Sequence, residues 1–98
     1  MAEFMIDITL PEDLEEDFLA KIPAQRTMVN RLMLKGIVTS YSLSMDRGKL
    51  WITMDASSKQ EIIRQLNAFP LIDYFTYHIY TLVFHNAPVM KVPPFSIN

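Results

Sequence analysis

The chain of 98 residues has no cysteine, only two glycines and two histidines, and no cluster of basic residues. The absence of cysteine excludes disulfides, thiolate metal sites and cysteine nucleophiles. Two glycines cannot form a glycine-rich phosphate loop. The net charge of −2 and the scattered Lys and Arg residues lack the basic footprint of nucleic-acid-binding proteins. We therefore expect no nucleic-acid partner and no nucleotide held by a phosphate loop.

Long apolar runs are also missing. No stretch approaches the roughly 20 residues that span a bilayer. No basic segment and no long apolar run precedes Asp7, so no signal peptide is visible. Together with the lack of cysteine, these features predict a cytoplasmic protein that does not associate with membranes.

What the chain does have is a high apolar content. It is 50% hydrophobic and 20% charged, which is typical of one small globular domain. A domain of this size buries only about 60–65% of the surface of its unfolded chain. We expect a second copy of the chain to cover part of the remaining apolar area. Residues 1–86 should form the domain, and residues 87–98, with three prolines, a tail that packs on a partner subunit.

Hydrophobic periodicity predicts the element order βαββαβ. A helix should open at Pro11, break or kink at Pro23 and end at Gly36; a second should begin with a Ser58–Glu61 capping box and end before Pro70. The strands are predicted over residues 3–10, 37–45, 49–56 and 74–84. Gly48 is expected to take a positive φ in the hairpin turn.

Right-handed crossovers convert this order into a ferredoxin-like α+β fold with sheet order 4-1-3-2 and both helices on one face. Strict alternation in the second strand puts Val38 beside Ser40 and Ser42, with Tyr41 and Leu43 on the opposite face. The uncovered sheet face mixes polar and apolar side chains. Such a face favours a homodimer built sheet to sheet, a dimeric α+β barrel.

One part of the sequence resembles a known family. "LNAFPLIDY" and the following strand with "TLVFH" are similar to the C-terminal half of muconolactone delta-isomerases, and "RLMLKG" is similar to a segment further back. The positions that match are Leu66, Pro70, Leu71, Tyr74, Leu82 and His85. The resemblance implies a dimeric α+β barrel and cofactor-free isomerisation of a small unsaturated lactone. The Trp-Arg pair and the Asn of the family's second strand and hairpin are not retained; Ser42 and Leu43 replace the pair, leaving Arg47 and Lys49 in a turn as the nearest cations.

His78 is the candidate catalytic group. If the first and last strands pair, Asp7 is its cross-strand neighbour, and a carboxylate beside an imidazole can orient it as a general acid or base. Tyr41 and Tyr80 are candidate donors to a bound carbonyl compound, and Trp51 could wall its pocket. His78 is alternatively a polar residue of a subunit interface. His85 is expected to cap the strand or contact a partner subunit, and the spacing of the two histidines predicts no metal site.

Three functions stay open at this point. The first is proton-transfer isomerisation of a small unsaturated or cyclic organic molecule. The second is a non-catalytic small-molecule-binding or structural dimer, which the missing arginine favours. The third is a cofactor-independent monooxygenase of the same barrel type, which would consume O₂.

Overall fold

The computed structural model describes residues 2–84. The tail at 87–98 and His85 lie outside these residues. Seven elements follow one another along the chain: β1 (Ala2–Thr9), α1 (Glu16–Leu34), β2 (Val38–Leu43), β3 (Lys49–Ala56), α2 (Lys59–Asn67), the 3₁₀ helix η1 (Ile72–Tyr74) and β4 (Thr76–Thr81).

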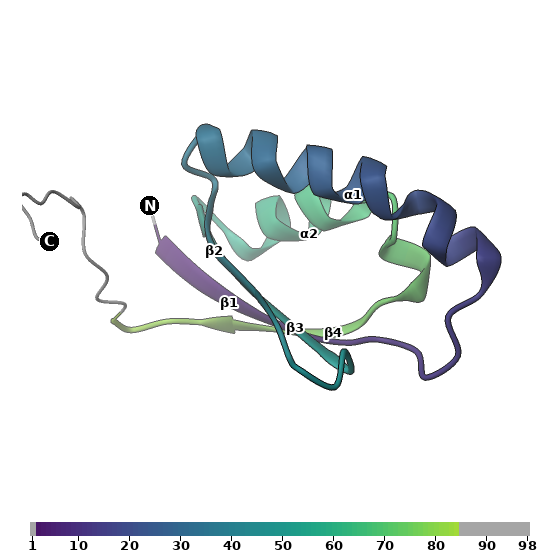
Figure 1. The fold of residues 1–98 in the computed structure, drawn as a ribbon. Coiled ribbons are helices and arrows are strands. Elements are labelled where there is room, and N and C mark those ends of the chain that lie inside the picture. Colours follow the sequence, from purple (N-terminus) through teal and green to yellow (C-terminus); the bar gives the residue numbers. More distant parts are fainter. Residues whose placement is uncertain (1, 85–98) are drawn as a thin grey trace, which may run out of the picture.

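The four strands form one antiparallel sheet in the order β2-β3-β1-β4, as predicted. Figure 1 shows α1 and α2 side by side on the same face of this sheet. The fold is therefore the predicted ferredoxin-like α+β arrangement. Its core lies between the two layers, where alternate residues of β1 and β3 meet the inner stripes of the helices. The most deeply buried members are Ile6, Ile8, Ile52, Met54, Ile62 and Leu66.

The first helix differs from the prediction in where it begins and in having no break at Pro23. It begins at Glu16, five residues beyond Pro11. Leu10 still follows the sheet, since its N–H donates to the Gly48 carbonyl at 3.0 Å, and the chain bends at Glu12 and Asp13 before the helix starts. Pro23 lies inside a continuous helix and does not break it. The Thr27 hydroxyl donates to the Pro23 carbonyl at 3.0 Å, one turn on. A single missing N–H is tolerated where the rest of the helix packs on the sheet.

The end of α1 follows the prediction. Gly36 has φ 77°, the Gly36 N–H donates to the Met33 carbonyl at 3.0 Å, and the Ile37 N–H donates to the Leu32 carbonyl at 2.9 Å. These two bonds form a Schellman motif, which needs a left-handed residue at this position. The capping role of Ser58 is also confirmed, since its hydroxyl accepts from the Glu61 N–H at 3.2 Å.

Strict alternation in the second strand is wrong, because a β-bulge interrupts the register between Val38 and Ser40. The hydroxyls of Thr39 and Ser40 both hydrogen-bond to the hydroxyl of Thr53, each at 2.6 Å, so two residues of β2 oppose one of β3. From Tyr41 on, the faces are therefore exchanged relative to Val38. Val38, Tyr41 and Leu43 share the face that the helices cover.

The hairpin between β2 and β3 also departs from the prediction. Arg47, and not Gly48, has the positive φ, at 65°. Gly48 instead serves the turn through its backbone N–H, which donates to the Asp46 carboxylate at 2.9 Å. A Cβ on Gly48 would come within 3.3 Å of that carboxylate, so a side chain there would crowd the turn.

Candidate functional site

The predicted neighbours Asp7 and His78 are direct cross-strand partners of β1 and β4. Both point away from the helices, because the residues that flank Asp7, Ile6 and Ile8, are fully buried on the other face. The Asp7 carboxylate accepts from the Lys49 ammonium at 3.2 Å. The structure thus confirms the predicted register and adds a lysine that pairs with the carboxylate.

Two further candidates share this outer face. Trp51 of β3 lies opposite Asp7, and Tyr80 of β4 lies opposite Met5. The rings of His78 and Tyr80 have centroids 6.5 Å apart. Trp51 is 38% exposed and Tyr80 53%. Four of the five predicted residues therefore lie on one open sheet surface.

Tyr41, the fifth candidate, does not join them. The bulge in β2 turns its side chain to the helix side of the sheet, where it lines a cavity between α1 and the sheet. The structure therefore separates Tyr41 from Asp7 and His78 by the thickness of the sheet.

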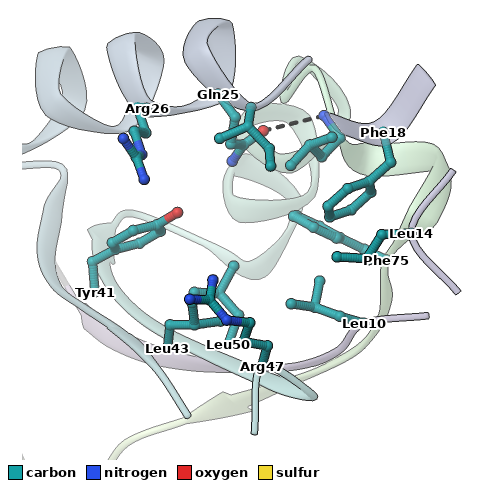
Figure 2. A pocket seen from close by; sticks show the side chains of 12 residues that line it. Leu10, Leu14, Phe18, Gln25, Arg26, Tyr41, Leu43, Arg47, Leu50 and Phe75 are labelled. Atoms are coloured by element: carbon teal, nitrogen blue, oxygen red, sulfur yellow. Dashed lines mark hydrogen bonds between the residues drawn. The ribbon is translucent and has the colours of Figure 1, made fainter. Parts of the chain in front are cut away.

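The cavity that Tyr41 lines has a volume of about 210 Å³. Its wall is mainly apolar and includes Leu10, Leu14, Phe18, Ile22, Leu50 and Phe75. Four polar side chains complete the lining: Gln25, Arg26, Tyr41 and Arg47 (Figure 2). An apolar recess with a few convergent polar groups is the usual form of a small-molecule site.

Gln25 is the most deeply buried polar residue of this wall, at 2% exposure. Its Oε1 accepts a hydrogen bond from the Leu71 backbone N–H at 3.1 Å (Figure 2). That N–H can only donate, so the amide orientation is fixed and Nε2 lies on the opposite side. Nε2 is buried and has no hydrogen-bond partner among residues 2–84. A buried amide N–H without a partner costs about 1–3 kcal/mol, unless something else supplies an acceptor.

The Tyr41 hydroxyl lies on the same side of the sheet as Gln25 (Figure 2). Burial raises the pKa of the Tyr41 phenol, and the positive charge of Arg26 opposes this in part. At neutral pH the phenol is therefore protonated and can donate a hydrogen bond to a molecule in the cavity.

Sequence reasoning missed Gln25 and Arg26 and assigned no role to Arg47. A signal for Gln25 is present in the sequence: Phe18, Ile22, Gln25, Val29 and Leu32 follow one helical stripe, and Gln25 is its polar member. No comparable signal exists for the arginines, because both are exposed residues whose direction depends on the packing of α1 and the turn.

Neither described helix is long and apolar enough to cross a membrane. Over residues 2–84, no group of three or more His, Asp or Glu side chains could hold a metal ion.

Comparison with family models and with curated proteins finds no match. Comparison with solved structures finds muconolactone isomerase. Its crystal structure superposes with a TM-score of 0.69, over 92% of this chain and 97% of that one, at 18% sequence identity. At this identity the likeness concerns the fold. The chain therefore has a muconolactone isomerase-like fold, as the resemblance of its second half predicted.

Proposed function

We propose that this protein binds a small organic molecule in the cavity between α1 and the sheet. The observation that carries the proposal is the apolar recess itself, whose lining brings Gln25, Arg26 and Tyr41 together from α1 and β2. The protonated Tyr41 could donate a hydrogen bond to a carbonyl or carboxylate of the ligand.

The volume limits the ligand to a small molecule. The cavity, at about 210 Å³, is smaller than the ~300–1,000 Å³ of sites for drug-sized ligands. It is larger than the ~150 Å³ apolar cavity that accepts benzene in an engineered protein. A one-ring compound or a short-chain acid, ester or lactone fits between these limits.

The test is an NMR titration with one-ring and short-chain compounds. Binding should shift the signals of Leu10, Phe18 and Phe75 in the cavity wall, with little change at Trp51 and His78. Leu14→Trp should weaken binding, since Leu14 lies in the cavity wall and a larger side chain would fill the recess. Leu19→Trp places the same side chain on the exposed side of α1 and serves as the control. Unchanged spectra with every compound, or equal binding by the two variants, would contradict the proposal.

A second candidate function is isomerisation of a small unsaturated lactone by proton transfer at Asp7 and His78. Two observations favour it: the direct pairing of these residues across β1 and β4, and the muconolactone isomerase-like fold. It requires a second copy of the chain, because the sheet surface that carries the pair is open in one copy. Trp51 and Tyr80 give that surface an apolar part on which the second copy could pack.

Both parts of this second proposal can be measured. Light scattering should give a molar mass twice that of the chain. In Trp51→Glu the molar mass should fall to that of a single chain. Isomerisation of unsaturated lactones should be lost in His78→Ala and Asp7→Asn and kept in Thr76→Ala, a control on the same strand and face. Equal isomerisation rates in His78→Ala and the parent protein would show that His78 has no catalytic role.

A further inference from the structure

Two arginines approach the cavity from separate parts of the fold. Arg26 extends from the middle of α1, and Arg47 from the hairpin between β2 and β3. In Figure 2 the guanidinium of Arg26 points toward the Tyr41 hydroxyl, and that of Arg47 lies on the opposite side of the cavity, beside Leu43 and Leu50. The influence of Arg26 on the pKa of Tyr41 shows that its charge reaches the phenol.

Neither arginine is neutralised by an ion pair within the part of the chain that the structure describes, since no carboxylate lies within 4.0 Å of either. Asp46, next to Arg47, is engaged elsewhere: it accepts from the Ser44 hydroxyl at 2.6 Å and from the Gly48 N–H at 2.9 Å. The hydrogen bond from Ser44, and to a smaller extent that from Gly48, lowers the pKa of Asp46 and keeps its carboxylate ionised. Glu12 and Asp46 line a second hollow, which shares Leu10, Leu14 and Arg47 with the cavity.

The backbone of Arg47 adds an independent observation. Its φ of 65° lies in the left-handed region that residues with a Cβ rarely adopt, while Gly48, free to adopt it, does not. Strained residues of this kind gather at ligand-binding positions, where the strain places a side chain. Here it places a cation at the rim of the cavity.

We propose that the ligand of this cavity is an organic carboxylate, with an apolar body among Leu10, Phe18 and Phe75 and its head group between Arg26 and Arg47. The inference rests on the proposed binding function and names its substrate class. Guanidinium groups bind carboxylates with two parallel hydrogen bonds, and Tyr41 can donate one more. Arg26 and Arg47 thereby determine the specificity for carboxylates. Their positions differ from that of the Trp-Arg pair in the second strand of muconolactone delta-isomerases.

The test compares acids with uncharged molecules of the same shape. Benzoate and hexanoate are titrated by calorimetry beside benzyl alcohol and hexanol. Each carboxylate should bind about tenfold or more tightly than its alcohol at low salt, as expected for a charge-assisted hydrogen bond. Added salt should weaken only the carboxylates.

Variants locate the effect. Arg26→Gln and Arg47→Gln should each reduce carboxylate affinity about tenfold and leave alcohol affinity unchanged, whereas Arg31→Gln removes a charge from α1 outside the cavity and should change neither. Arg47→Lys keeps the charge, so it should recover part of the affinity lost in Arg47→Gln. Both arginines are exposed, so these variants should unfold at the temperature of the parent protein.

The outcomes separate the two proposals. Equal affinity for acids and alcohols, or Arg26→Gln and Arg47→Gln variants that bind benzoate as the parent does, would overturn the carboxylate inference and leave the binding site standing. Absence of binding by all four probes at millimolar concentration would overturn both.

Discussion

Replacing Arg47 with glycine should make the protein more stable. Arg47 has a φ of 65°, and the left-handed region brings Cβ close to the following carbonyl oxygen, at a cost of about 1–2 kcal/mol. Glycine has no Cβ and adopts this conformation without that cost. Arg47→Gly therefore removes strain from the folded protein.

An opposing effect acts on the unfolded chain. Glycine has more backbone freedom there than arginine, which lowers the free energy of unfolding by about 0.4–1 kcal/mol. Little else is lost, since Arg47 is exposed and has no salt bridge among residues 2–84. The net stabilisation is about 0.8 kcal/mol at the centre of these ranges. For a chain of this length it raises Tm by about 3–6 °C.

Urea unfolding followed by circular dichroism measures this difference. Arg47→Ala is the matched control, because it also removes the guanidinium but keeps a Cβ and its strain. The glycine variant should unfold at a higher urea concentration than both the alanine variant and the parent, with the same m-value. Both variants should lose the preference for carboxylates, so the glycine variant gains stability as it loses binding.

A lower free energy of unfolding for Arg47→Gly than for the parent would refute the reasoning. Equal stability of the glycine and alanine variants would refute it as well, because it would mean that the backbone of Arg47 is not strained.

Four further outcomes follow from the same geometry. Gly36→Ala should lower the free energy of unfolding by about 0.5–1 kcal/mol, measured in urea: φ is 77°, and an added Cβ meets nothing within 4 Å, so only the backbone is strained. Gln25→Leu should change the free energy of unfolding by less than about 1 kcal/mol, because the loss of the acceptor for the Leu71 N–H is offset by removal of the unpaired Nε2. A loss above about 2 kcal/mol would show that Nε2 has a hydrogen-bond partner in the folded protein. Burial raises the pKa of Tyr41. The contribution of the Tyr41 phenol to the free energy of unfolding is therefore complete below the unfolded-state pKa near 10 and is lost as pH rises through the folded-state pKa. Tyr41→Phe should flatten this loss of stability at alkaline pH, and parallel plots of stability against pH for the two proteins would contradict the prediction. His78→Ala, on the sheet face that is open in one copy of the chain, should leave Tm within about 4 °C of the parent, since an exposed substitution changes stability by at most about 0.5 kcal/mol.

The sequence predicted the fold because its signals are local and repeated. Alternation in β1 assigned Ile6 and Ile8 to one face and Asp7 to the other, and the same period in β4 placed His78 opposite Asp7 once the strands were paired. Gly36 marked a helix end for a stereochemical reason, the left-handed conformation. Pro11 and Pro23 misled the prediction, because a proline permits a helix start or disfavours a helix interior without deciding either when tertiary packing holds the segment.

The cavity could not be predicted in the same way. Its polar lining combines a helix, a strand and a turn, and the direction of each side chain depends on an irregularity that periodicity does not record. One extra residue in β2 puts Tyr41 on the same face as Val38, the face that the helices cover. The left-handed backbone conformation of Arg47 sets the direction of its side chain, which lines the cavity.

By itself the sequence determined the order of the β-strands and α-helices, the antiparallel sheet, the placement of Asp7 and His78 on one sheet face and the absence of any cysteine chemistry. Each of these follows from residue type or from a period along the chain. Only the tertiary structure decided that Gln25 is buried with an unpaired Nε2, and that Arg26, Tyr41 and Arg47 meet at one recess. The physical reason is that a bulge, a strained turn and the gap between a helix and a sheet are set by packing among distant segments, and no local pattern of residues encodes them.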